Sequence, residues 1–215
     1  MWLILIYVLL CIWLFITFKT HLEIHDSIPF YNGSGIIDHV NSERDEQIIA
    51  DTFIDANDNV LELGTRYGTV SCLLARKANR VVSLDPDLEA LNVAKENMKR
   101  HGVYFDCVHG IISVKPQSIK LNDYETTTTV SETSDIPNYT IEQIERKFNI
   151  KFNTLVADCE GCLENVVNEN DLSYFYKITY EKDQPHRCNY EEISSKLHNM
   201  GFKLIHDKFH VVWIR

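Results

Sequence analysis

Positive charge is in short supply in this sequence of 215 residues. Lysine and arginine together number 21, against 31 aspartates and glutamates, so the formal net charge is −10 at pH 7. A protein that binds nucleic acid gains much of its affinity from lysines and arginines that contact phosphates. The charge balance therefore argues against a nucleic-acid partner. The apolar fraction of 45% is that of a chain with a sizeable buried core, so disorder is not expected.

The sequence also lacks the paired cysteines of a disulfide framework. Six cysteines are present, and Cys11 lies in an apolar N-terminal run. The other five are an odd number at irregular spacing: Cys72, Cys107, Cys159, Cys162 and Cys188. We therefore expect these thiols to be reduced.

Residues 1–18 contain no charged side chain. As a helix they would span about 27 Å, close to the thickness of the hydrocarbon core of a bilayer. The run has neither the basic start nor the small-residue cleavage site of a secretory signal. We predict an uncleaved, single-pass membrane anchor. The cytosolic side is favoured for the rest of the chain, because free thiols suit it. Residues 19–42 would form a polar stalk, and residues 43–215 the main domain.

Strand-like and helix-like segments alternate through most of this domain, which predicts parallel βαβ units. The predicted strands are 60–63, 80–84, 103–108, 152–157 and 175–180. The predicted helices are 45–54, 69–78, 88–101, 140–148, 163–168 and 190–200. Two last strands, 202–205 and 210–214, are joined so tightly that they must be antiparallel neighbours. We predict a doubly wound α/β fold, Rossmann-like, with a mostly parallel seven-stranded sheet that ends in this antiparallel hairpin.

Residues 115–139 do not fit the alternation. The threonine run 126–129, with serine and aspartate around it, is typical of an irregular loop, and a hairpin is also compatible with it. Long loops in compact domains are commonly functional lids or mobile segments, and the sequence leaves both open.

The most informative motif follows the first strand of the alternating pattern. Glu62 stands near the end of that strand, and Gly64, Thr65 and Gly68 lie in the turn that leads into the next helix. Glycine lets a backbone turn tightly and approach a ligand where a side chain would collide. A dinucleotide site would have a further glycine between these two and a pyrophosphate at the helix end, which Glu62 would repel. An acidic strand end suits a sulfonium with an amino-acid tail, so the motif favours S-adenosylmethionine (SAM) over NAD.

The next two strands supply candidates for the nucleoside part of such a cofactor. Asp85 and Pro86 end the second strand, where a carboxylate would accept hydrogen bonds from both ribose hydroxyls. Asp85 could instead cap helix 88–101, although Asp87 is also placed to do so. The third strand leads to His109 and Gly110, where adenine would lie. His109 could equally be an ordinary loop histidine.

Acidic side chains follow the fourth strand. Asp158 would lie beside the methyl group of the cofactor, where a carboxylate can orient a hydroxyl and accept its proton. We predict Asp158 as a cofactor contact and as the base or hydroxyl-orienting group. Glu160 would share that role or cap the following helix. Glu181 and His186 are further candidates, His186 because imidazole titrates near neutral pH, although a loop histidine is commonly plain surface.

Together these motifs resemble the FkbM family of class I SAM-dependent methyltransferases. The matching residues are Glu62, Gly64, Gly68, Asp85, Pro86, Asp158, Glu160 and Gly161. The Asp-x-Glu-Gly element is the most specific part of the match. The resemblance implies O-methylation of a hydroxyl on a sugar, a glycan-type or another small acceptor. Arg66 stands where the family has asparagine, and Leu163 replaces a glutamate. These departures bear mainly on the acceptor side of the site.

Two other classes of protein are compatible with parts of the sequence. Cys159 and Cys162 have the spacing of a metal or dithiol pair, and His186 with Cys188 could complete a tetrahedral zinc site. However, this pair interrupts a motif that is explained without it, so no metal is predicted. The second alternative is a membrane-tethered module that keeps the SAM fold and binding site without catalysis.

Overall fold

The computed structural model describes residues 29–37, 43–121 and 126–215. The predicted membrane anchor, residues 1–18, lies outside these ranges. Within the described ranges, no helix has both the length and the apolar character needed to cross a membrane. The described part of the predicted stalk is a short hairpin of β1 (Phe30–Tyr31) and β2 (Ile36–Ile37). Its backbone is held to the following domain at Tyr31, whose N–H donates to Asn97 Oδ1 at 2.8 Å.

The predicted seven-stranded sheet is confirmed. Its strands in chain order are β3 (Asn59–Leu63), β4 (Arg80–Asp85), β5 (Asp106–His109), β10 (Thr154–Ala157), β11 (Lys177–Glu181), β12 (Lys203–Asp207) and β13 (His210–Ile214). Their order across the sheet is β12-β13-β11-β10-β3-β4-β5. Five neighbouring strands, from β11 to β5, run parallel. The C-terminal hairpin lies antiparallel beside β11, as predicted.

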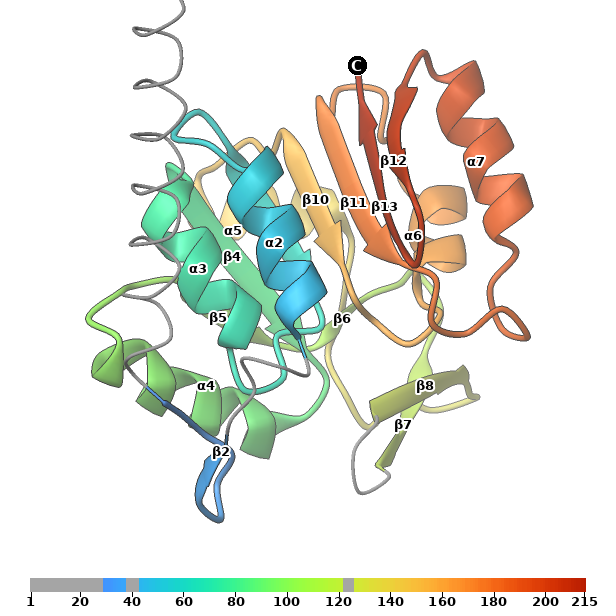
Figure 1. Ribbon diagram of the computed structural model, residues 1–215. Helices are drawn as coiled ribbons and strands as arrows, with labels where there is room; N and C mark the ends of the chain where they lie inside the picture. Colours follow the sequence, from blue (N-terminus) through green and yellow to red (C-terminus); the bar gives the residue numbers. More distant parts are fainter. Residues whose placement is uncertain (1–28, 38–42, 122–125) are drawn as a thin grey trace, which may run out of the picture.

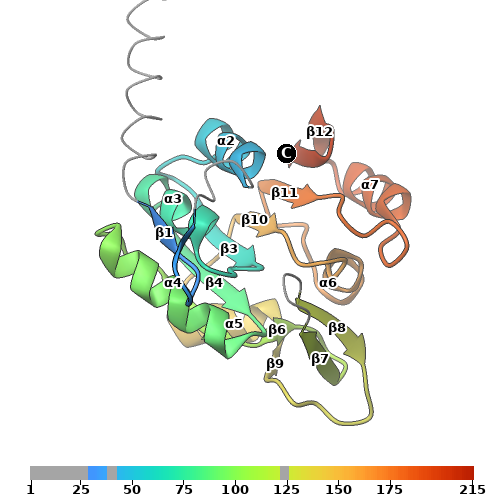
Figure 2. The same cartoon turned by 60° about the horizontal axis from the view of Figure 1, so that its bottom comes forward.

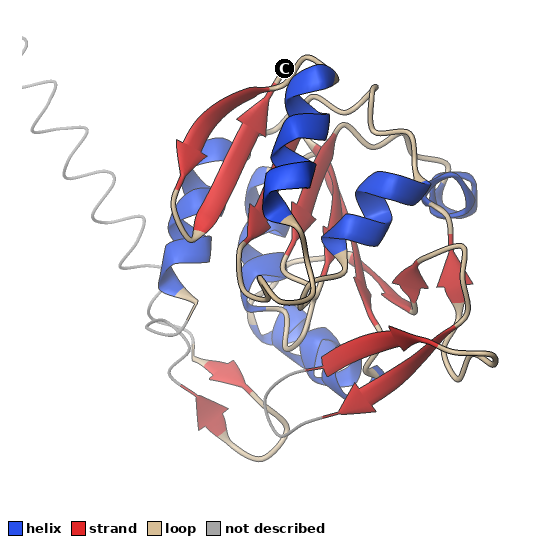
Figure 3. Cartoon of the chain, turned by 90° about the vertical axis from the view of Figure 1, so that its right-hand side faces the viewer, coloured by secondary structure: helices blue, strands red, loops and turns tan. Residues whose placement is uncertain are grey.

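Helices cover both faces of this sheet (Figures 1 and 3). One layer contains α2 (Arg44–Phe53), α3 (Thr69–Lys77) and α4 (Leu88–Arg100), and the other α5 (Ile141–Phe148), α6 (Leu163–Glu169) and α7 (Tyr190–Asn199). The period of two along a strand separates the layers. Val60 packs in the core beneath the first layer, whereas the adjacent Leu61 packs in the core beneath the second.

The segment between β5 and α5 is more ordered than the sequence indicated. The pairs are β6 (Ile111–Ile112) with β9 (Asn138–Tyr139), and β7 (Gln117–Leu121) with β8 (Thr126–Val130). Of the two descriptions that the sequence left for residues 115–139, an irregular loop and a hairpin, the structure shows the hairpin. Figure 2 shows β7 and β8 apart from the main sheet, beyond the ends toward which its central strands point.

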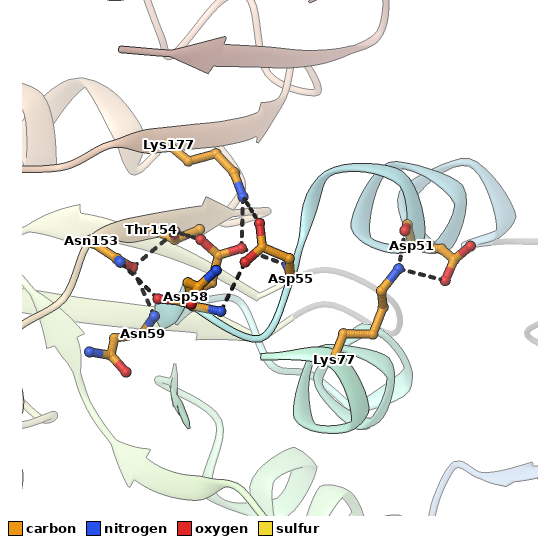
Figure 4. Close-up of polar contacts among 9 residues, drawn as sticks. Asp51, Asp55, Asp58, Asn59, Lys77, Asn153, Thr154 and Lys177 are labelled. Carbon is orange, nitrogen blue, oxygen red and sulfur yellow. Dashed lines mark hydrogen bonds and ion pairs between the residues drawn. The ribbon is translucent and has the colours of Figure 1, made fainter. Parts of the chain in front are cut away.

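A buried ion pair joins the amino ends of the central strands (Figure 4). Lys177 Nζ lies 2.7 Å from Asp58 Oδ2, and both side chains are 3% exposed. The other carboxylate oxygen of Asp58 accepts a hydrogen bond of 2.6 Å from Thr154 Oγ1. Because these residues belong to or adjoin β3, β10 and β11, the contacts align three strands whose opposite ends carry the predicted site.

Candidate active site

A pocket of about 610 Å³, partly open to solvent, lies at the carboxyl ends of β3, β4 and β10. Ligands of open α/β sheets bind at this edge, where the strand order reverses. Here the chain passes from β3 outward to β4 and β5, and later returns to the other side of β3 as β10. Of the residues predicted as a site, those that line this pocket are Gly64, Asp85, Pro86, Gly110, Asp158 and Glu160.

Gly64 is the point at which two strand-end loops touch. Its φ is +93°, a left-handed conformation that favours glycine. A Cβ added there would lie 1.5 Å from the carbonyl oxygen of Asp158. Glycine is therefore required for the contact between the loops after β3 and β10. The sequence analysis gave a different reason for this glycine, the close approach of a ligand.

Asp85 is buried in the pocket wall at the end of β4. Its carboxylate accepts hydrogen bonds from the backbone N–H groups of Arg66, at 2.7 Å, and Asp87, at 2.8 Å. Burial raises the pKa of this carboxyl group to about 6. Asp87, and not Asp85, caps α4, because its side chain accepts from the N–H groups of Glu89 and Ala90. Asp85 is thus held rigidly at the position predicted to bind ribose.

Glu62 and Gly68 shape the loop after β3 without lining the main pocket. The Glu62 carboxylate is buried and accepts hydrogen bonds from the hydroxyls of Ser71, at 2.5 Å, and Ser83. Burial raises its pKa to about 7. Gly68, with φ +79°, precedes α3, and a Cβ there would meet Ala94 of α4 at 3.1 Å. Both residues therefore fix the position of the loop.

A second, smaller cavity of about 320 Å³ lies on the other side of Gly64. Glu43, which precedes α2, and Glu46, within α2, line this cavity. Glu62, Thr65 and Asp158 line it as well. Thr65 is buried, and within the described part of the chain its hydroxyl has no hydrogen-bond partner. A buried hydroxyl without a partner is unfavourable, so a ligand group in this cavity would stabilise it.

Asp158 directly follows β10 and lines both cavities. Its backbone N–H donates to the carbonyl of Leu63 at 2.9 Å, which continues the ladder between β10 and β3. Its carboxyl group lies beside that of Glu181 at the end of β11, with carboxylate oxygens within 4.8 Å of each other. Burial, followed by repulsion from Glu181, raises the pKa of Asp158 well above its usual range. The pair therefore retains a proton in conditions where an exposed aspartate is ionised.

Glu160 occupies a left-handed position, with φ +53°, that non-glycine residues rarely adopt. Its carboxylate accepts a 2.7 Å hydrogen bond from Gln184 Nε2 in the loop after β11. Helix α6 begins at Leu163 with Cys162 at its N-cap position, so Glu160 does not cap that helix.

The prediction that the five cysteines after residue 18 are reduced is wrong for one pair. Cys159 and Cys162 form a disulfide that encloses Glu160 and Gly161. Two cysteines that flank a two-residue turn can lie close enough to bond. The expectation of reduced thiols rested on the odd number of cysteines, which carries no information about this distance. Both sulfurs are used in the disulfide, so neither can ligate zinc in this state. Cys72, Cys107 and Cys188 are free thiols.

Neither of the two predicted histidines, His109 and His186, lines the main pocket or the smaller cavity. His109 Nε2 lies 3.0 Å from the carbonyl oxygen of Pro86, a residue that lines the pocket, and His109 itself does not line it. Gly110 lines the pocket with φ +141°, and a Cβ there would meet the carbonyl oxygen of Pro137 at 2.5 Å. His186 is exposed and lines none of the cavities described above. The structure does not bring it to Asp158.

The β7–β8 hairpin supplies a wall that sequence reasoning missed. Thr126 and Thr128 line the main pocket. Arg66 Nη1 donates to Thr126 Oγ1 at 3.3 Å, and Arg187 Nη2 donates to the carbonyl of Thr128 at 2.5 Å. Alternation along the threonine run is the one signal that could have indicated this: the side chains of residues 126 and 128 lie on the same face of β8.

Comparison with known proteins gives a consistent result for the fold. No family model matches the chain. A ribosomal protein L11 methyltransferase from Staphylococcus epidermidis is 28% identical over 167 residues, which cover 76% of this chain and 44% of that protein. The chain therefore spans less than half the length of this relative.

Two solved structures share the architecture. A precorrin-6y C5,15-methyltransferase from Geobacter metallireducens superposes with a TM-score of 0.53, at 8% identity over 88% of this chain and 95% of that one. An O-methyltransferase from Bacillus cereus, in complex with SAH, gives a TM-score of 0.51, at 14% identity over 81% and 80%. The chain thus has the α/β fold of these methyltransferases, with the mostly parallel sheet that the sequence predicts.

Proposed function

We propose that this chain is a SAM-dependent methyltransferase. One observation carries the proposal: carboxylates at the ends of β4 and β10, Asp85 and Asp158, line a single pocket on either side of β3. The first is placed for a nucleoside and the second for a reacting group. The likeness of the chain, in sequence and in fold, to proteins named as methyltransferases supports the proposal.

The residues present fit this cofactor. Asp85 would accept hydrogen bonds from the ribose hydroxyls, and Pro86 and Gly110 would border the adenine. The Thr65 hydroxyl, which has no hydrogen-bond partner among the described residues, and the carboxylates that line the smaller cavity would meet the amino-acid end. When bound, SAM supplies a methyl group activated by a positively charged sulfur.

The role of Asp158 is to orient the acceptor and to take its proton. A carboxyl group beside the pocket can hold a hydroxyl in line with the methyl group, and alignment of this kind removes much of the barrier to a two-body reaction. A base with a pKa near the working pH is the most effective proton acceptor. The raised pKa of Asp158 makes its carboxylate a stronger base than that of an exposed aspartate. Glu160 would contact the acceptor from the same turn.

The proposed acceptor rests on the family resemblance of the sequence motifs. The resemblance to FkbM proteins supports O-methylation of a hydroxyl on a sugar, a glycan-type or another small molecule. The charge of −10 favours such an acceptor over nucleic acid. We also propose that residues 1–18 tether the enzyme to a membrane by a single span, which favours acceptors at that surface.

Calorimetric titration of the full chain with SAM tests the cofactor. Wild type should bind, Asp85→Asn should lose at least tenfold in affinity, and Glu89→Gln, an exposed acid on the adjacent helix, should bind normally. Absence of binding by wild type would reject the proposal.

Incubation with methyl-labelled SAM and fractionated cell material then tests catalysis. Asp158→Asn should bind SAM yet lose labelling by roughly a hundredfold or more, which is the usual contribution of a general base. Full labelling by this variant would refute the assigned role. Binding by wild type without labelling of any fraction would favour the silent module.

A further inference from the structure

Three further ionisable side chains lie near Asp158 but outside the main pocket. Glu181 ends β11, His210 begins β13, and Glu46 lies in α2. They line a third cavity, of about 340 Å³, which Asp158 does not line. Carboxylate oxygens of Asp158 and Glu181 lie within 4.8 Å of each other, so the group at the reaction pocket is a direct neighbour of this second set.

The contact between Glu181 and His210 is set by the sheet. The two residues are direct partners in the antiparallel register of β11 and β13. Side chains of such partners stand close on one face, so their contact does not depend on a flexible loop. His210 Nε2 lies 3.5 Å from Glu181 Oε1 and 3.7 Å from Glu46 Oε1. A small rotation of either side chain would bring the ring nitrogen to hydrogen-bond distance.

Of the three residues, only His210 has a buried side-chain atom without a hydrogen-bond partner among the described residues, its Nε2. The atom is buried and makes no hydrogen bond within the described residues, although two carboxylates flank it. The side chain as a whole is 12% exposed, so part of the ring lies at the protein surface. An imidazole between a buried carboxyl pair and solvent has the chemistry of a proton carrier.

We propose that Glu181 and His210 are positioning residues that carry the proton of the acceptor from Asp158 to solvent. The inference rests on the proposed function. When an acceptor hydroxyl is methylated, its O–H bond breaks and an O–C bond forms, so one proton must leave. The Asp158–Glu181 pair, holding one proton and one negative charge, accepts it and becomes two neutral acids. Transfer of a proton from Glu181 to His210 Nε2 restores the single charge, and the imidazolium then releases its proton to water.

Carboxyl groups from three segments face the relay, and the rest of the third cavity is lined by apolar side chains with Thr179 and Tyr180. The groups that face the relay are Glu43 and Glu46 from the α2 end, Asp158 and Glu160 after β10, and Glu181 and Asp183 at the end of β11. The nearby Lys182 is paired with Asp207 at 2.5 Å. Burial and repulsion from Asp158 raise the pKa of Glu46 to about 8, so it adds little charge of its own near neutral pH.

The first test needs neither cofactor nor acceptor. The pH titration of the Glu181 carboxyl carbon is followed by NMR in the full chain. His210→Gln removes a group that favours the carboxylate, so the pKa of Glu181 should rise by at least half a unit. His206→Gln, on the adjacent strand β12, is the matched control and should leave it unchanged. An unchanged Glu181 titration in His210→Gln would overturn the relay.

The second test separates the relay from the proposed function. His210→Gln should bind SAM as wild type does, transfer labelled methyl about tenfold more slowly, and shift the acidic limb of its pH–rate profile to higher pH. Equal rates and profiles for the two proteins would overturn the relay while leaving the methyltransferase proposal intact. Failure of wild type to bind SAM would instead remove the proposed function, whatever the NMR titration shows.

Discussion

The carbonyl oxygen of Asp158 occupies the space that a side chain at Gly64 would need, 1.5 Å from the position of a Cβ. This contact joins the loop that is placed for the cofactor to the loop that carries the proposed base. The two loops therefore cannot be altered independently, and a change at Gly64 acts on both.

Gly64→Ala should destabilise the fold by about 3 kcal/mol or more, because the methyl group meets backbone and alanine disfavours a positive φ. Urea unfolding measures this directly. Gly35→Ala, where a Cβ would meet nothing within 4 Å, is the matched control and should change stability by less than about 1 kcal/mol. A Gly64→Ala variant as stable as the control would show that the loops separate without cost.

The affinity for SAM should fall as the solution becomes more acidic. Ribose hydroxyls donate to the ionised form of Asp85, and burial raises the pKa of this group to about 6. The carboxylate is thus mostly present at pH 7 and mostly protonated at pH 5, which predicts roughly tenfold weaker binding at the lower pH. Calorimetry at both values checks this. In Asp85→Asn the residual affinity should not vary over this range, and a persisting tenfold change would assign the titration to another group.

The ion pair between Lys177 and Asp58 predicts a large loss of stability when one partner is removed. Lys177→Met leaves the Asp58 carboxylate buried without its cation, which typically costs about 3–5 kcal/mol. Lys182→Met removes a lysine from an exposed pair with Asp207 and should cost less than about 1 kcal/mol. Denaturant unfolding of the two variants should therefore differ clearly, and similar midpoints would contradict the role assigned to the buried pair.

The disulfide in the pocket wall predicts a specific labelling pattern. When the chain is unfolded without reductant and treated with an alkylating reagent, Cys72, Cys107 and Cys188 should be modified. Cys159 and Cys162 should be modified only after reduction. Peptide mass spectrometry reads each site separately. Labelling of both cysteines before reduction would restore the prediction of free thiols made from the sequence.

Some roles of individual residues could not be assigned from the sequence. Asp85 and Asp87 could each have capped α4, and only the hydrogen bonds of the folded chain assign the cap to Asp87. His186 had a suitable side chain for a base but is exposed, whereas His210 gave no signal in the sequence and lies beside Glu181. Side-chain chemistry is visible in a sequence, but the direction in which a loop side chain points is not.

The sequence by itself determined the order along the chain of the main-sheet strands and their helices, the antiparallel end of that sheet and the edge at which the pocket lies. These depend on local patterns: the period of apolar residues, the length of connections and the glycines that follow a strand. The tertiary structure alone decided the Cys159–Cys162 disulfide, the threonine wall from β8, and the partnership of Glu181 with His210. Each of these depends on distances between chain segments, and such distances are set by strand register and by loop packing, which no local pattern records.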